Sequence, residues 1–105
     1  MKYIYVITMI VDIIENSRDS KWSRIGRSRT LAWYPTKKKA IDAVLTNEMD
    51  LRDNDHKYAV VEKYLPGAWT ACKQEWWFEW DDDKECYLPI DKPYCVSCII
   101  NFGIG

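Results

Sequence analysis

The sequence contains a single histidine, His56, among 105 residues, and this scarcity limits the catalysis it can support. His56 follows Asp53, Asn54 and Asp55 in a polar stretch, which is the usual setting of a solvent-facing side chain. A cysteine–histidine or serine–histidine–aspartate site would have to use this residue, and no nucleophile motif accompanies it. We therefore predict no catalytic residues and rank an enzyme last among the functional alternatives.

Glycine and proline are also few, with four residues each. The glycines form neither the phosphate-binding loop nor the dinucleotide-binding pattern, so the nucleotide folds that depend on those motifs are excluded. There is no internal repeat and no low-complexity segment. With 48% hydrophobic and 30% charged residues, residues 1–105 are expected to form one globular domain.

No apolar run is long enough to cross a bilayer. The most apolar stretch, residues 3–14, is too short, is interrupted by Asp12, and is not followed by a small-residue cleavage site. Its many β-branched residues favour a buried central strand instead. We therefore expect a cytoplasmic protein with no membrane partner.

Four cysteines, Cys72, Cys86, Cys95 and Cys98, are expected to be reduced in such a compartment. Cys95 and Cys98 have the C-x-x-C spacing of zinc ligands and of redox pairs. A structural zinc site usually needs a second close pair, and a redox pair normally opens a helix, whereas this pair leads into a predicted strand. We therefore predict no metal and no cofactor.

The pattern of apolar residues predicts an α+β fold. One amphipathic helix is expected over residues 37–48, with Thr36 as its N-cap after Pro35. The order ββαββ(β) predicts a mostly antiparallel sheet of four to six strands with the helix packed on one face. The expected strands are residues 2–14, 24–34, 58–65, 74–80, 86–90 and 96–104.

The net charge of −1 conceals an uneven distribution. Residues 18–39 are strongly basic and residues 75–85 are strongly acidic. A protein that binds bulk nucleic acid would usually be basic overall, so this balance favours a local site for an anion. The alternative is that both segments are solvated surfaces whose charges pair with each other.

Three lysines in the first turn of the predicted helix mark the candidate anion site, because the helix dipole favours negative charge there. A bound phosphate would resolve this conflict, and arginines on the preceding strand would add bidentate contacts. Aromatic side chains nearby would stack on a base, and a glycine would admit the ligand to the backbone. Arg27, Arg29, Leu31 and Trp33 are expected on one face of their strand. The predicted ligand-binding residues are Trp22, Arg24, Gly26, Arg27, Arg29, Trp33, Tyr34, Lys37, Lys38 and Lys39.

A run of aromatic residues at 76–80 is the second candidate feature. Trp76, Phe78 and Trp80 share one face of the predicted strand and are expected in the core. Trp77 points the other way, so we expect it in a groove or at an interface, which makes a homo-oligomer a further prediction.

Several segments together resemble a group of short, uncharacterised proteins of bacteria and their bacteriophages. The resemblance covers most of the chain and is carried by residues 24–34, 39–44 with Asn47, 58–62, 77–80 and 101–105. Small phage-borne proteins of this size often act on host defence by binding, so the resemblance implies sequestration of a nucleotide signal or inhibition of a host protein.

These observations lead to one main hypothesis and one alternative. The main hypothesis is a non-enzymatic protein that binds a phosphate-bearing small molecule, such as a nucleotide signal. The alternative is a protein-interaction module that presents Trp77 and the acidic residues 81–83 to a basic partner.

Overall fold

The computed structural model describes residues 3–11, 13–15, 23–25, 28–46, 57–65, 72–93 and 102. Their main sheet has five antiparallel strands in the order β4-β1-β5-β6-β7, and a separate two-stranded sheet joins β2 to β3. In chain order the elements are β1 (Ile4–Ile10), β2 (Ile13–Glu15), β3 (Ser23–Ile25), β4 (Ser28–Tyr34), α1 (Lys37–Leu45), β5 (Tyr58–Tyr64), β6 (Gln74–Asp81) and β7 (Cys86–Ile90).

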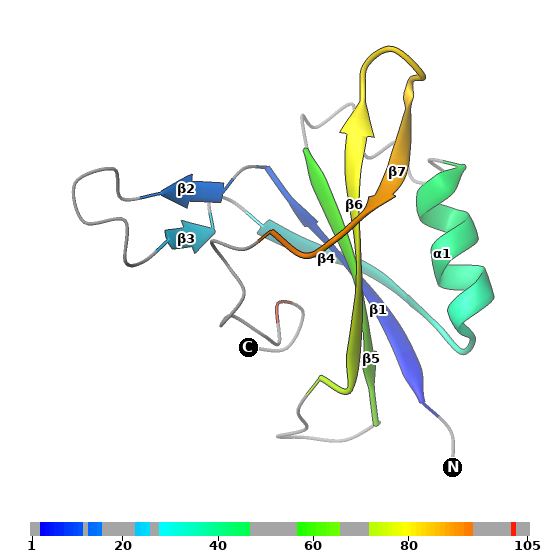
Figure 1. The fold of residues 1–105 in the computed structure, drawn as a ribbon. Helices are drawn as coiled ribbons and strands as arrows, with labels where there is room; N and C mark the ends of the chain where they lie inside the picture. The colour runs from blue at the N-terminus through cyan, green and yellow to red at the C-terminus, as the bar shows by residue number, and fades with distance from the viewer. Residues whose placement is uncertain are drawn as a thin grey trace.

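The helix α1 lies along one face of the main sheet, and the β2–β3 ribbon projects away from it on the other side (Figure 1). This arrangement confirms the predicted α+β class, with an antiparallel sheet and one helix on one face. Among the described residues, no helix has the length and apolar character needed to cross a membrane.

Each of the two long strands predicted near the N-terminus is divided in two. Strand β1 pairs with β5 as far as Ile10 opposite Tyr58, where β5 begins. Among the described residues the ladder with β5 ends there, and Ile13–Glu15 pair with β3 in a separate sheet. The predicted antiparallel hairpin is therefore correct in direction, while its two strands are divided between two sheets.

A bulge in the edge strand β4 changes which side chains share a face. Ile7 pairs with Ala32 and Thr8 pairs with Thr30, so Leu31 is an extra residue on β4. The predicted common face of residues 29, 31 and 33 is consequently wrong. Arg29 lies opposite Met9 and Trp33 lies opposite Val6, three residues apart on β1 and hence on opposite faces.

The helix begins where the sequence predicts it. The hydroxyl of Thr36 accepts a hydrogen bond of 3.3 Å from the backbone N–H of Lys39, which caps the first turn. The helix ends at Leu45, before the predicted end at residue 48, and Thr46 donates from its own N–H to carbonyls of the last turn. Residues 47 and 48 lie outside the described part of the chain.

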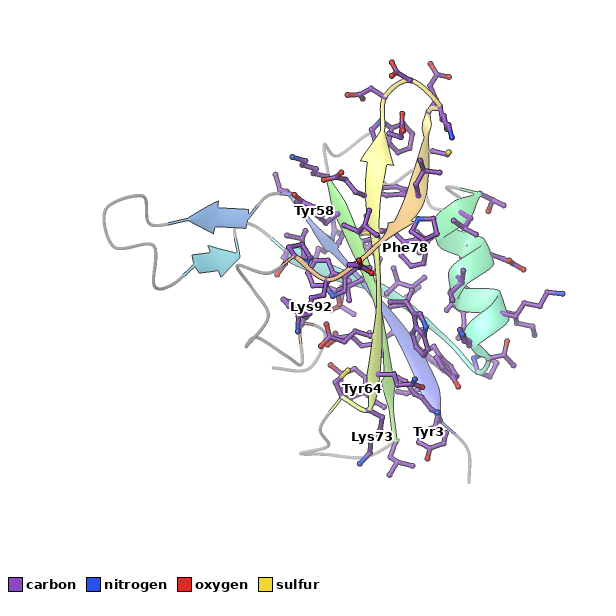
Figure 2. The ribbon with its side chains drawn as sticks, in the orientation of Figure 1. Tyr3, Tyr58, Tyr64, Lys73, Phe78 and Lys92 are labelled. Atoms are coloured by element: carbon purple, nitrogen blue, oxygen red, sulfur yellow. The ribbon has the colours of Figure 1, made fainter. Side chains whose placement is uncertain are left out.

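The face of the sheet beneath α1 holds the larger core. Phe78 is buried there and points toward the helix (Figure 2), and Trp76 and Trp80 pack against the same cluster, as predicted. Small side chains on α1 let the helix approach the sheet closely. The buried members are Ile7, Met9, Ala40, Ala43, Val44, Ala59, Val61, Phe78 and Tyr87.

The opposite face of the sheet carries a second, smaller core. Ile10, Val60 and Trp77 are buried there, with Tyr58 and Phe102 packed against them. Trp77 is only 3% exposed, and it lines a groove, which is one of the two alternatives expected for it from the sequence. Phe102 covers it edge-on, with ring centroids 5.2 Å apart. Of the predicted strand at residues 96–104, Phe102 alone is described, and it lies in a turn.

Candidate functional site

The predicted anion site is only partly within the described residues. Trp22, Gly26 and Arg27 lie outside them, as does the side chain of Arg24, whose backbone belongs to β3. The other predicted ligand residues are described, and the structure does not gather them at one point.

The strand β4 separates the predicted phosphate and base contacts. Arg29 is exposed on the face that α1 covers, whereas Trp33 is on the opposite face and is 63% exposed. Tyr34 is half-buried against the helix-side core. Arg29 and Trp33 therefore cannot hold the phosphate and the base of one small ligand between them, because the sheet lies between their side chains.

Lys37 instead contacts a tryptophan of strand β6, far from it in the sequence. Its Nζ atom lies 4.7 Å from the centroid of the Trp76 ring, which is a cation–π contact between the first turn of α1 and strand β6. Lys38 and Lys39 in the same turn are exposed. Residues this far apart share no local sequence signal, so the sequence could not have paired Lys37 with Trp76.

A groove opens beside this contact. It has a volume of about 370 Å³ and is lined by Lys37 and Ile41 of α1, by residues 75–78 of β6, and by residues 89–92. It lies where the pairing of β6 with β7 ends, because Trp77 opposite Ile90 is the last pair and the first residues of β6 extend past β7. Its volume lies at the lower end of the range of small-molecule pockets, and its wall is mostly apolar with a few charged groups.

Glu75 lines the groove on the same face of β6 as Trp77, away from α1. Its Oε2 atom forms an ion pair of 3.0 Å with Lys92, and its Oε1 atom accepts a hydrogen bond of 2.8 Å from the indole N–H of Trp77. Both partners of the ion pair are mostly buried, with side chains 23% and 13% exposed. Lys92 lies on the side of the sheet away from α1 (Figure 2).

A second carboxylate faces Glu75 from the neighbouring strand. Glu62 of β5 lies directly opposite Glu75 of β6 and is fully buried. Its Oε2 atom accepts a hydrogen bond of 3.0 Å from the backbone N–H of Phe102. Like charges directly opposite each other destabilise a sheet. The contacts of Lys92, the Trp77 indole and the Phe102 N–H with the two carboxylates offset this repulsion.

The thiol of Cys72 completes the group. The Cys72 Sγ atom and one carboxylate oxygen of each of Glu62 and Glu75 all lie within 4.8 Å of one another. Burial, followed by the negative charges of Glu62 and Glu75, raises the pKa of the Cys72 thiol to about 12. The thiol is therefore protonated at neutral pH and donates to the carbonyl oxygen of Gln74 at 3.1 Å, so it is not poised as a nucleophile.

The acidic turn between β6 and β7 is held by its own side chains. Asp81 accepts hydrogen bonds from the backbone N–H groups of Asp83 and Lys84, at 2.9 and 3.1 Å. Asp82 accepts one of 2.9 Å from the indole of Trp80. Asp81 and Asp82, two of the three acids at residues 81–83, therefore stabilise a tight turn. Glu85, at the end of this turn, has a positive φ of 53°.

Comparisons with protein-family models, with curated proteins and with solved structures found no match for this chain.

Proposed function

We propose that this protein is a non-enzymatic binding protein for a phosphate-bearing small molecule with a planar ring, such as a nucleotide. The observation that carries the proposal is the Lys37–Trp76 contact at the rim of the groove. A nucleotide presents one planar face and one anionic group, and the groove presents an aromatic ring beside an ammonium group.

Ligand binding would replace the Lys37–Trp76 contact by two contacts with the ligand. The base would take the place of Lys37 over the Trp76 ring, and the freed ammonium group would pair with the phosphate. Base–aromatic stacking contributes about 1–3 kcal/mol for each base, which is more than an exposed cation–π contact contributes. The exchange is therefore favourable for a ligand that carries both groups.

The groups that would bind the ligand are the Trp76 ring and the Lys37 ammonium group. The Cys72 thiol is protonated, and both oxygens of Glu75 already accept contacts from Lys92 and Trp77. This supports capture without turnover, which is the behaviour needed to sequester a nucleotide signal in the cytoplasm of a bacterial host. The proposal keeps the phosphate ligand expected from the sequence and moves its centre from Trp33 to Trp76.

The test is a thermal-shift screen of the purified protein against mononucleotides, cyclic oligonucleotides and ADP-ribose derivatives, with the ligand recovered and checked by chromatography. A ligand that binds at micromolar concentration is expected to raise the Tm by several degrees and to be recovered intact. Loss of the compound with appearance of a product would show an enzyme and would contradict capture without turnover.

Two lysines of the same helical turn provide a matched pair of variants. Lys37→Glu and Lys39→Glu relieve the same conflict with the helix dipole, while Lys37 lines the groove and Lys39 does not. We expect Lys37→Glu to weaken binding about tenfold or more, equivalent to about 1.4 kcal/mol, and Lys39→Glu to change it little. Equal losses in the two variants, or no Tm shift with any compound, would exclude the groove as the site.

A second candidate function is supported by the exposure of Trp33. This residue is 63% exposed on β4, which is an edge of the five-stranded sheet. An edge strand presents unpaired backbone groups, and an exposed tryptophan beside them is typical of a protein-interaction surface. In this alternative the protein regulates a host protein or pairs with a second copy of itself through β4.

A further inference from the structure

The three donor atoms of Glu62, Cys72 and Glu75 converge from two neighbouring strands and the residue pair that leads into β6. Glu62 and Glu75 are fixed in register by the sheet, and Cys72 lies two residues before β6 begins. All three atoms lie within 4.8 Å of one another. In a tetrahedral zinc site, with oxygen at about 2.0 Å and sulfur at about 2.3 Å from the metal, the ligand atoms lie about 3.3 to 3.5 Å apart. Small side-chain rotations would bring the three atoms from their present spacing to these distances.

The surroundings of this cluster favour a bound cation independently of the spacing. The two carboxylates lie on the face of the sheet that also buries Val60 and Trp77, where water is scarce. Glu62 accepts a hydrogen bond from the Phe102 N–H, and Glu75 lies directly opposite it, so a cation would meet two carboxylates on this face. Lys92 brings one positive charge to this place through Glu75.

The carboxylates are also held in the way that metal ligands usually are. The backbone N–H of Phe102 orients Glu62, and Lys92 together with the Trp77 indole orients Glu75. A carboxylate oxygen has two lone pairs, so each of these oxygens can accept one such bond and still coordinate a metal. Outer partners of this kind fix the direction of metal ligands and raise metal affinity.

We propose that Glu62, Cys72 and Glu75 form a zinc-binding site, with water as the fourth ligand. Carboxylate and thiolate together are donors that zinc accepts readily. On binding, the S–H bond of Cys72 breaks, the zinc–sulfur bond forms, and the proton leaves to the solvent with no change of oxidation state. The charges of Glu62, Glu75 and the thiolate are then balanced by zinc and Lys92. This site does not involve the C-x-x-C pair and does not depend on the ligand proposed for the groove.

The site can be tested with cobalt(II), which binds zinc sites and reports thiolate ligation by a near-ultraviolet charge-transfer absorption. Metal-free full-length protein is titrated with Co²⁺, and Zn²⁺ is then added to displace it. We expect one cobalt ion per chain, a thiolate band, and loss of the band on zinc addition. The absence of binding or of a thiolate band in the wild-type protein would overturn the proposal.

Cysteine variants assign the ligand. Cys72→Ser is expected to remove the thiolate band, and Cys86→Ser, a matched change at a free cysteine on β7, is expected to retain it. A double variant, Cys95→Ser with Cys98→Ser, is also expected to retain it. If the band survives Cys72→Ser or disappears in the double variant, the metal is held elsewhere and the proposed site is wrong.

A carboxylate variant supplies a test that does not involve the cysteines. Glu75→Gln keeps the shape of the side chain and removes the charge, and we expect it to weaken cobalt binding at least tenfold. Circular dichroism of the metal-free variants confirms that they are folded. Unchanged affinity in folded Glu75→Gln would overturn the assignment even if Cys72→Ser cannot be purified.

Discussion

Glu62 and Phe102 are joined by a hydrogen bond of 3.0 Å from the Phe102 backbone N–H to the buried carboxylate, although forty residues separate them in the chain. The same residue places its ring edge-on against Trp77, and Lys92 lies 5.7 Å from that ring. Phe102 is therefore held on the second face of the sheet by contacts from β5, β6 and Lys92. Its ring covers Trp77, the residue that the sequence predicted in a groove or at an interface.

Phe102→Ala is expected to lower the free energy of unfolding by about 1–3 kcal/mol, less than a fully buried phenylalanine would cost because this ring is partly exposed. The tryptophan emission of the variant should also shift to longer wavelength as water reaches Trp77. Denaturant unfolding followed by fluorescence measures both effects. Phe102→Leu is the control, since it keeps most of the apolar contact. Wild-type stability in Phe102→Ala would show that the contact is not maintained in solution.

Thr36→Ala is expected to destabilise the protein by about 1 kcal/mol, because the Lys39 N–H loses the hydroxyl that caps the helix. Thr36→Asp keeps an acceptor and adds a negative charge beside three lysines at the positive end of the helix dipole. It should therefore be at least as stable as the wild type at low salt, and any advantage should shrink as salt is raised. Thermal unfolding at two salt concentrations measures this. Equal stability of wild type and Thr36→Ala would contradict the cap.

Trp33→Ser is expected to leave the free energy of unfolding within about 0.5 kcal/mol of the wild type, since the indole is largely exposed. If β4 forms an interface between copies, the same variant should shift the protein toward the monomer. Light scattering across a concentration series measures this shift. A wild type that stays monomeric at every concentration would rule out self-association through this edge.

Cys72 of the metal-free protein is expected to resist alkylation at pH 8. With a thiol pKa of about 12, the thiolate fraction at pH 8 is about 10⁻⁴, on the order of a thousandfold below that of an ordinary cysteine. The native state holds this proton more tightly than the unfolded state does. The stability that it contributes is therefore complete below about pH 8.5 and is lost as the pH rises toward 12. Peptide mapping after iodoacetamide treatment measures the reactivity of Cys72 alone.

Denaturant provides the control for that experiment, because unfolding removes the burial and the neighbouring carboxylates. Cys72 should then react at the ordinary rate. Rapid labelling of Cys72 in the folded protein would mean that the thiol is more exposed to water than the structure shows.

The sequence alone determined the features that depend on near neighbours. The strands now seen as Tyr58–Tyr64, Gln74–Asp81 and Cys86–Ile90 follow from their β-branched and aromatic residues and from the turn residues between them. The start of α1 follows from the Thr36 cap and the spacing of apolar residues after it. The antiparallel order with one covering helix follows in turn, because short connections leave few other ways to bury these faces.

Tertiary structure alone decided which side chains meet. The extra residue Leu31 in β4 placed Arg29 and Trp33 on opposite faces, and the periodicity of a strand cannot reveal an insertion of this kind. The Lys37–Trp76 contact and the Glu62–Cys72–Glu75 cluster join residues from different elements. Such contacts depend on strand register and on the packing of α1, both of which are set by how the whole core fills its space.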